Sequence, residues 1–182
     1  MSTLKKIVAI GPESTGKSSL CQALASHYGT LWCPEYARDY LLENDNNYLE
    51  PDLEVIAKGQ LALEELQTKE AERRKDPFLF IDTDMYVMKV WSEYSFERCA
   101  HFILDQIAKR RYDLYLLCHI DLPWTPDILR EYPDLQNRQE LFRIYQDLLE
   151  QQSVPFVDIT GGNFERIKPA IRAIDERYLN EK

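Results

Sequence analysis

The sequence has no apolar run long enough to cross a bilayer, and no long apolar stretch follows its first residues as one does in a secretory signal peptide. It is also short of basic residues: 22 Lys and Arg stand against 31 Asp and Glu, for a formal net charge of −9. This balance argues against a nucleic-acid partner, which a protein usually meets with a basic face. The four cysteines form no C-x-x-C pair, and Cys21 and Cys118 fall within apolar segments, where reduced core cysteines lie. We therefore expect a cytoplasmic protein with neither a membrane nor a nucleic-acid partner. The sequence predicts no oligomeric state.

Neither an internal repeat nor a low-complexity linker divides the 182 residues, a length that suits one domain with a substantial core. Apolar strand-like runs alternate with helical patterns. This alternation predicts an α/β fold with a central parallel sheet of about five strands and helices on both faces. Pro155 cannot donate to a strand ladder, so the last strand is expected to lie at the sheet edge or to begin at the proline. The expected strands are residues 5–10, 30–33, 77–82, 112–118 and 155–159.

Helical periodicity predicts the other elements. Pro51 is placed as a first-turn proline of a long helix that runs to about Lys75. Phe164 fits the apolar spacing of the last helix, but Pro169 interrupts it, so this helix either starts near Lys168 or bends there. Further helices are expected at 19–28, 84–95, 97–110 and around 141–152, with Tyr86, Trp91 and Tyr94 as core or helix-packing residues.

A phosphate-binding loop lies near the start of the chain, at Gly11-Pro12-Glu13-Ser14-Thr15-Gly16-Lys17-Ser18. It fits the pattern G-x-x-x-x-G-K-[ST] and lies between a strand-like run and a helical one, which is the context that this motif requires. Its glycines let successive N–H groups and the helix N-terminus face a phosphate. The pattern predicts a P-loop NTPase with a three-layer sandwich fold that binds ATP and Mg²⁺. The candidate nucleotide-binding residues are Gly11, Glu13, Ser14, Thr15, Gly16, Lys17, Ser18 and Ser19.

A carboxylate at the end of a buried strand supports this prediction. Asp82 ends the apolar run 78–82 and is expected to hold Mg²⁺ together with the hydroxyl of Ser18. Motor-type and AAA-type ATPases often place a glutamate directly after this aspartate to activate water, whereas Thr83 follows here. A GTPase would usually carry an Asn-Lys-x-Asp motif, and the sequence has none. Both absences favour transfer of a phosphoryl group to a bound acceptor over hydrolysis.

The region of about 119–138 is expected to form a lid. It holds three prolines and several charges, and long ordered connections are often functional. Arg130 and Arg138 lie in it, where arginines would stabilise the transferring phosphoryl group and closure would exclude water.

The acceptor would need a base, and carboxylates follow two of the strands. Lys17 is the catalytic residue expected at the phosphates. Glu35 is the first choice for the residue that takes the acceptor's proton, with Asp82 and Asp84 as alternatives. Two structural alternatives stay open. One is an ion pair between Glu35 and Arg38. The other is a helix-capping role for Asp84 in place of binding a sugar diol.

Several segments together resemble the ribosylnicotinamide kinase family, the kinase domain of NadR-type proteins. They are Gly-Pro-Glu-Ser-Thr-Gly-Lys-Ser (11–18), Pro-Glu-Tyr-Ala-Arg (34–38), Ile-Asp-Thr-Asp (81–84), Tyr-Asp-Leu-Tyr-Leu-Leu (112–117), Leu-Pro-Trp-Thr-Pro-Asp-Ile-Leu-Arg (122–130) and Thr-Gly-Gly (160–162). The resemblance implies transfer of the ATP γ-phosphate to the 5′-hydroxyl of nicotinamide riboside, a Mg²⁺ cofactor and a salvage role in NAD synthesis. It covers most of the chain but departs in the lid, where Asp127-Ile128-Leu129-Arg130 replaces the Asp-Gly-x-Arg of many members. The alternatives are a kinase for another nucleoside and a regulatory module that senses ATP or a pyridine nucleotide without turnover.

The resemblance also implies where the two substrates bind. An adenine-side loop would comprise Gly161, Gly162 and Asn163. The cationic pyridinium ring of the riboside would lie against aromatic rings in cation–π contacts, and carboxylates would bind its ribose hydroxyls. The candidate acceptor-binding residues are Glu35, Tyr36, Arg38, Asp84, Trp124 and Asp127.

Overall fold

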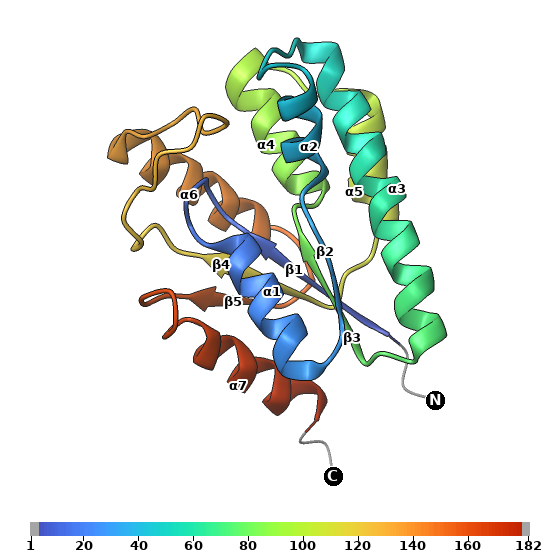
Figure 1. The fold of residues 1–182 in the computed structure, drawn as a ribbon. Helices are drawn as coiled ribbons and strands as arrows, with labels where there is room; N and C mark the ends of the chain where they lie inside the picture. The colour runs from blue at the N-terminus through green and yellow to red at the C-terminus, as the bar shows by residue number, and fades with distance from the viewer. Residues whose placement is uncertain (1–3, 180–182) are drawn as a thin grey trace.

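The computed structural model describes residues 4–179. In this part of the chain, five strands form one parallel sheet in the order β2-β3-β1-β4-β5, and helices connect them (Figure 1). In chain order the elements are β1 (Lys5–Ile10), α1 (Lys17–Tyr28), β2 (Leu31–Cys33), α2 (Tyr36–Glu43), α3 (Glu50–Arg74), β3 (Phe78–Asp82), α4 (Met85–Phe96), α5 (His101–Lys109), β4 (Leu114–Cys118), α6 (Leu135–Glu150), β5 (Phe156–Ile159) and α7 (Ile167–Tyr178).

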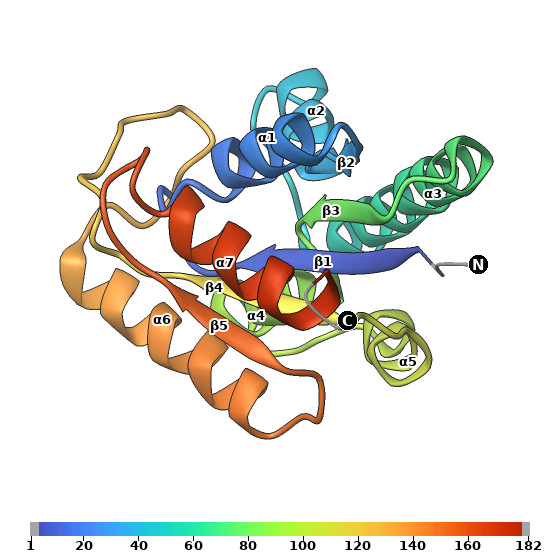
Figure 2. The same ribbon diagram turned by 90° about the horizontal axis from the view of Figure 1, so that it is seen from below.

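The central strand β1 is apolar on both faces, because helices cover both sides of the sheet. Ile7 and Ala9 face a cluster completed by α1 and α7, whereas Val8 and Ile10 face a cluster completed by α4 and α6. All four side chains are fully buried. The result is a three-layer arrangement, seen from two directions in Figures 1 and 2. Because the strands are parallel, their carboxyl ends share one edge of the sheet.

A second group of helices, α2 to α5, packs around an apolar cluster of its own, and α3 runs alongside β2 and β3 (Figure 1). Helix α3 carries Pro51 in its first turn, where the missing N–H costs no hydrogen bond. The helix ends before Lys75, whose backbone is in the left-handed conformation. Its residues Leu53 and Ile56 pack against Met88 of α4 and Ile103 of α5. The long helix expected from Pro51 to about Lys75 is confirmed.

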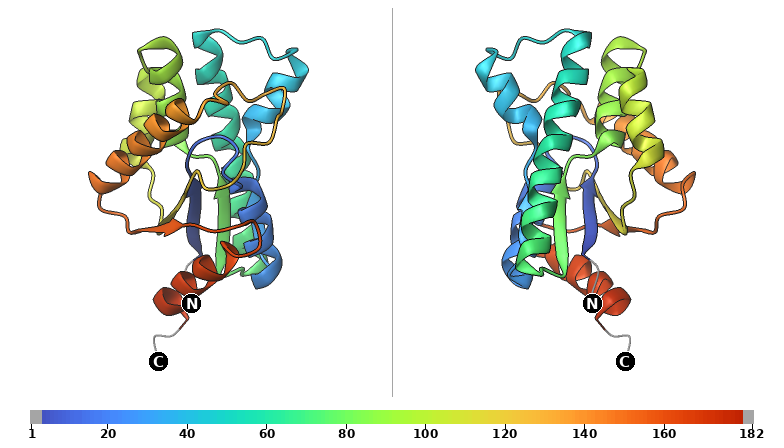
Figure 3. Two further views of the ribbon diagram at one scale, coloured as in Figure 1. Left: turned by 90° about the vertical axis from the view of Figure 1, so that its left-hand side faces the viewer. Right: turned by 90° about the vertical axis from the view of Figure 1, so that its right-hand side faces the viewer.

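The lid is the connection between β4 and α6. It runs across the carboxyl edge of the sheet, from the end of β4 toward α2, as the amber segment of Figure 3 shows. It ends at Asp134, whose carboxylate caps α6 by accepting from the N–H groups of Gln136 and Asn137. Because α6 begins at Leu135, Arg138 lies in the first turn of that helix.

The α/β fold with a five-strand parallel sheet is confirmed, and β5 begins directly after Pro155 at the sheet edge. Of the two alternatives for the last helix, the start near Lys168 is right: α7 begins at Ile167 and holds Pro169 in its first turn. Phe164 therefore lies outside the helix, 87% exposed. Helix α2 was not expected from the sequence. None of the described helices combines the length and the apolar character that crossing a membrane requires.

Candidate functional site

The loop between β1 and α1 is built so that only glycine fits at two points. A Cβ on Gly11 would lie 2.6 Å from the carbonyl oxygen of Cys118, and Gly16 has a φ of +75° just before the first turn of α1. Inside the loop, the buried Thr15 hydroxyl donates to the carbonyl of Pro12 at 2.7 Å. Lys17 Nζ donates to the same carbonyl at 2.8 Å. The loop is thus held in one shape at a helix N-terminus, which is a favourable site for an anion.

Ser18 and Asp82 meet at the end of β3, as the sequence predicts. The Ser18 hydroxyl donates to Asp82 Oδ2 at 2.5 Å, while Asp82 Oδ1 is buried without a hydrogen-bond partner. Burial and, next, the nearby Glu35 carboxylate raise the pKa of Asp82 to about 6, against the opposing effect of Lys17. An orphaned carboxylate oxygen beside a hydroxyl fits Mg²⁺, which commonly takes one or two protein ligands and completes its shell with phosphates and water.

The phosphate-binding residues and the candidate base Glu35 line one cleft of about 530 Å³. Asp82 lines the same cleft, and Glu35 is close enough to Asp82 to raise the pKa of that carboxyl. Glu35 precedes α2, and its Oε1 accepts a hydrogen bond from Thr83 Oγ1 at 3.3 Å. The predicted alternative, an ion pair between Glu35 and Arg38, is not formed. Arg38 instead pairs with Asp127 of the lid at 3.0 Å, and both of these residues line the cleft.

The lid is fastened to the P-loop through Glu13. One oxygen of the Glu13 carboxylate accepts from the backbone N–H groups of Glu131 and Tyr132, at 3.0 and 3.2 Å. Burial is the largest cause of a raised pKa for this carboxyl, although these two hydrogen bonds and Lys17 oppose the shift. The acid in the middle of the P-loop therefore holds the lid over the cleft.

The two predicted lid arginines have different places. Arg130 lines the cleft and donates from Nη1 to Ser14 Oγ at 3.3 Å. Arg138 is buried, with Nη2 at 3.5 Å from the carbonyl oxygens of Ser14 and Leu122. The Trp124 ring lies 5.8 Å from the Arg130 guanidinium and 5.5 Å from that of Arg138. Trp124 thus packs on these two arginines, and it is not among the residues that line the cleft.

Two further acceptor candidates are not among the residues that line the cleft. Asp84 caps α4 by accepting from the N–H groups of Tyr86 and Val87, and its other oxygen accepts from the Tyr115 hydroxyl at 2.8 Å. Since both oxygens are occupied and the side chain is buried, the capping alternative is the one observed. Tyr36 packs with the α3 cluster, and it is absent from the cleft lining.

The aromatic residues that line the cleft include two, Trp91 and Tyr94, that were expected to be core or helix-packing residues. Trp91 and Tyr94 of α4 line the cleft together with Tyr132 of the lid and Tyr145 of α6. Tyr94 and Tyr132 meet edge to face, with ring centroids 5.0 Å apart, and the Trp91 indole N–H donates to Tyr48. The spacing of Trp91 and Tyr94, three residues apart on one helix face, was the available signal.

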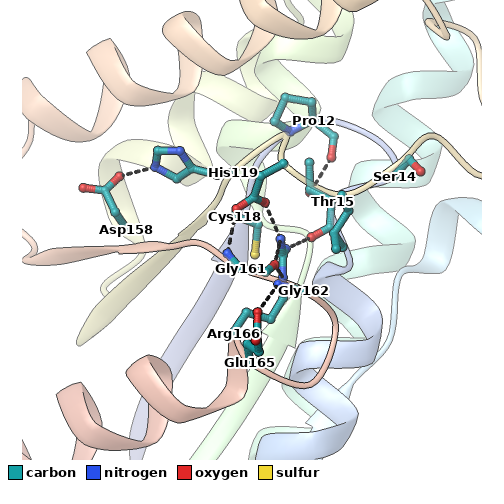
Figure 4. Close-up of polar contacts among 12 residues, drawn as sticks. Pro12, Ser14, Thr15, Cys118, His119, Asp158, Gly161, Gly162, Glu165 and Arg166 are labelled. Carbon is teal, nitrogen blue, oxygen red and sulfur yellow. Dashed lines mark hydrogen bonds and ion pairs between the residues drawn. The ribbon is translucent and has the colours of Figure 1, made fainter.

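A buried arginine that the sequence gave no reason to single out connects the P-loop to the loop after β5. Arg166 is 1% exposed and donates to the carbonyl oxygens of Thr15 and Gly161 and to the carboxylate of Asp121 (Figure 4). Asp121 in turn accepts from the N–H of Gly161. The loop expected at the adenine side, Gly161 to Asn163, therefore lies beside the P-loop, although these residues do not line the cleft.

A protein-family model described as an AAA domain matches residues 6–166. The chain belongs to this AAA domain family. Among curated proteins, the "Trifunctional NAD biosynthesis/regulator protein NadR" of Escherichia coli (strain K12) is 28% identical over 166 residues, which cover 89% of this chain and 40% of that protein. NadR of Salmonella typhimurium (strain LT2) is 27% identical over the same coverage. The resemblance to NadR-type proteins is confirmed, and this AAA domain spans less than half the length of these relatives.

Solved structures agree with the fold. A crystal structure of NadR protein in complex with NR matches this AAA domain with a TM-score of 0.75 and 23% identity, covering 94% of this chain and 49% of that one. Deoxyadenosine kinase from M. mycoides with bound dATP matches with a TM-score of 0.60 and 13% identity, over 94% of this chain and 99% of that one. The P-loop kinase-like fold is therefore shown, and with it the fold-level basis for nucleotide binding.

Proposed function

We propose that the protein is an ATP-dependent kinase that phosphorylates the 5′-hydroxyl of nicotinamide riboside, giving nicotinamide mononucleotide for NAD salvage. The observation that carries this proposal is that the P-loop, Asp82 and Glu35 line one cleft, with the lid fastened to the P-loop through Glu13. Such a cleft has room for a triphosphate and an alcohol acceptor side by side. The relatives supply the acceptor: NadR is named for NAD biosynthesis, and solved NadR structures hold NR, or NAD and AMP-PNP.

The walls of the acceptor half suit a cationic nucleoside. Trp91, Tyr94 and Tyr132 offer aromatic faces, on which a pyridinium ring gains about 0.5–2 kcal/mol per well-placed contact. Glu35 adds a negative charge to the cleft lining, whereas the charge of Asp127 is offset by its ion pair with Arg38. This combination favours a positively charged base over a neutral one.

The proposed reaction assigns one task to each polar group. Glu35 accepts the proton of the acceptor hydroxyl while the oxygen of that hydroxyl bonds to the γ-phosphorus. At the same time the bond between the γ-phosphorus and the oxygen that bridges it to the β-phosphate breaks, which releases ADP. Lys17 and Arg130 stabilise the charge on the transferring group. Ser18 and Asp82 would hold Mg²⁺, which when bound supplies charge neutralisation at the phosphates.

The lid and the absent water-activating acid both favour transfer to an alcohol. Thr83 follows Asp82 and directs its hydroxyl to Glu35, so no carboxylate follows Asp82 at the position where many ATPases activate water. The lid contacts made by Glu13 exclude water from the phosphates when the lid is closed.

The test is a turnover assay with Mg²⁺-ATP and a panel of nicotinamide riboside, deoxyadenosine and thymidine, read by chromatography and ³¹P spectroscopy. We expect nicotinamide mononucleotide and ADP in equal amounts, and little product from the other nucleosides. Faster phosphorylation of another nucleoside overturns the acceptor assignment. Tight ATP binding without any turnover favours a sensing module instead.

Matched variants test the roles. Glu35→Gln is expected to lower kcat by about 10²–10⁴-fold, the usual size of a general-base contribution, while ATP binding is retained. Lys17→Ala is expected to abolish transfer in a folded protein, as circular dichroism would verify. Glu43→Gln is the control, because it makes the same change at the exposed far end of α2, outside the cleft. Full activity in Glu35→Gln would remove Glu35 from the base role.

A further inference from the structure

Thr83, the residue between Asp82 and Asp84, has a backbone conformation that its side chain disfavours. Its φ is +77°, and it is 1% exposed. A β-branched residue in this region is an outlier that costs on the order of 1–3 kcal/mol, so the surrounding structure must enforce it. In this conformation the Thr83 hydroxyl lies 3.3 Å from Glu35 Oε1 and donates to it. The strain thus coincides with a contact to the proposed base.

A buried amide on α3 fixes the main chain on either side of the same glutamate. Gln60 is fully buried, and its Oε1 accepts from the N–H of Tyr36 at 2.7 Å. Its Nε2 donates to the carbonyl oxygen of Pro34 at 3.2 Å and to that of Asp82 at 3.4 Å. One side chain therefore ties the residues before and after Glu35 to the end of β3, which carries Asp82.

The neighbouring Gly59 shows that α3 is shaped for this segment. A Cβ on Gly59 would lie 2.1 Å from Cε1 of Tyr36, so the ring occupies the space that a larger residue would fill. A glycine inside a helix costs about 1 kcal/mol relative to alanine. The segment Pro34–Tyr36 is thus seated on α3 by packing at Gly59 and by hydrogen bonds at Gln60.

We propose that Thr83 and Gln60 are positioning residues for Glu35: Gln60 sets the distance of the 34–36 segment from Asp82, and Thr83 orients the Glu35 carboxylate. This inference rests on the proposed function, in which Glu35 takes the acceptor's proton. The need for such support is evident from the local structure, because Glu35 lies between a three-residue edge strand and an eight-residue helix. A misplacement of 1 Å in a reacting group can cost about 100-fold in rate.

Isosteric variants separate positioning from folding. Thr83→Val keeps the volume and the β-branch but removes the hydroxyl, and we expect kcat to fall about 10-fold with KM for ATP unchanged. Thr83→Ser, which retains the hydroxyl, is expected to recover most of the activity. Gln60→Met is expected to lower kcat by about 10–100-fold. The control is Glu64→Gln, one turn along α3 and equally buried, where the carboxylate binds Lys6, Arg110 and Tyr112 away from the cleft. It is expected to lose stability in urea but to keep kcat.

A double-mutant cycle gives the decisive result. If Thr83 acts through Glu35, Thr83→Val has no further effect on kcat in a Glu35→Gln background. Equal losses in both backgrounds overturn the inference, as does full activity in Thr83→Val and Gln60→Met while Glu35→Gln is impaired. Full activity in Glu35→Gln, by contrast, overturns the base role itself. If Gln60→Met does not fold, the cycle at Thr83 still decides the matter.

Discussion

Replacing Arg166 should reveal how strongly the nucleotide loop depends on a side chain that does not line the cleft. In Arg166→Met the apolar stem is kept and the guanidinium is lost. The carbonyl oxygens of Thr15 and Gly161 then lose their donor, and Asp121 loses its partner. Thr15 is fully buried, so water cannot replace the donor there without opening the loop.

The size of the effect follows from these contacts. An unsatisfied buried acceptor costs about 1–3 kcal/mol, and the Thr15 and Gly161 carbonyls are both affected. The Asp121 side chain is 37% exposed and regains hydration, so its share is small. We therefore expect Arg166→Met to lower the free energy of unfolding by about 2–4 kcal/mol, mostly from the buried Thr15 carbonyl and less from the partly buried Gly161. Arg166→Lys, which keeps the charge but not the fork of donors, should lose less.

Urea unfolding followed by circular dichroism measures this loss, and titration calorimetry measures ATP binding in the same samples. The matched control is Arg172→Met in α7, the helix that begins directly after Arg166, where the side chain is 80% exposed and pairs with Glu176. That variant should stay within about 0.5 kcal/mol of the parent. If Arg166→Met also stays within about 1 kcal/mol of Arg172→Met, the buried network does not support the P-loop, and the reasoning is wrong.

Two other changes have defined outcomes. Glu13→Ala removes the acceptor for two lid N–H groups, so we expect amide hydrogen exchange at Glu131 and Tyr132 to become about 10-fold faster or more. Glu13→Gln, which keeps an acceptor oxygen, should have a smaller effect. Unchanged exchange in Glu13→Ala would show that Glu13 does not hold the lid. Burial raises the pKa of Asp84 from an ordinary value of 3.8 to about 6. The folded state therefore binds this proton more tightly than the unfolded state does. The resulting stabilisation is present below about pH 4 and is lost as the pH rises through about 6. Between pH 4 and pH 7 the free energy of unfolding of the parent should therefore fall by about 3 kcal/mol more than that of Asp84→Asn, which lacks the titrating group. Urea unfolding at each pH, with a chelator present, measures the difference. Identical pH profiles would contradict the assignment of this shift to Asp84.

The sequence was most informative where a backbone conformation, or the regular spacing of apolar residues, requires particular residue types. The P-loop glycines, the apolar strand that ends in Asp82 and the proline at the start of α3 each had a local cause, and the structure places all three as predicted. The parallel sheet followed from the alternation of apolar runs.

The acceptor side was harder to predict because its geometry comes from contacts distant in sequence. Asp84 and Trp124 had the right chemistry for a nucleoside, but the first is occupied by a helix cap and the Tyr115 hydroxyl, and the second by two arginines. Conversely, Trp91 matched a helix-packing residue in sequence and proved to line the cleft. Arg166 gave no signal, since its partners lie up to 151 residues away.

The placement of Glu35 bears on what kind of phosphoryl transfer this cleft favours. A carboxylate directly after Asp82 would lie on the same strand as the metal-binding residue and could direct water at the phosphate. Here the carboxylate comes from the segment between β2, which pairs with β3, and α2, and the Thr83 hydroxyl donates to it. The acid thereby lines the cleft from a different segment than Asp82, with its carboxylate held by the Thr83 hydroxyl. This arrangement supports phosphoryl transfer to a bound alcohol, because the base is fixed in the cleft that the lid would close over an acceptor.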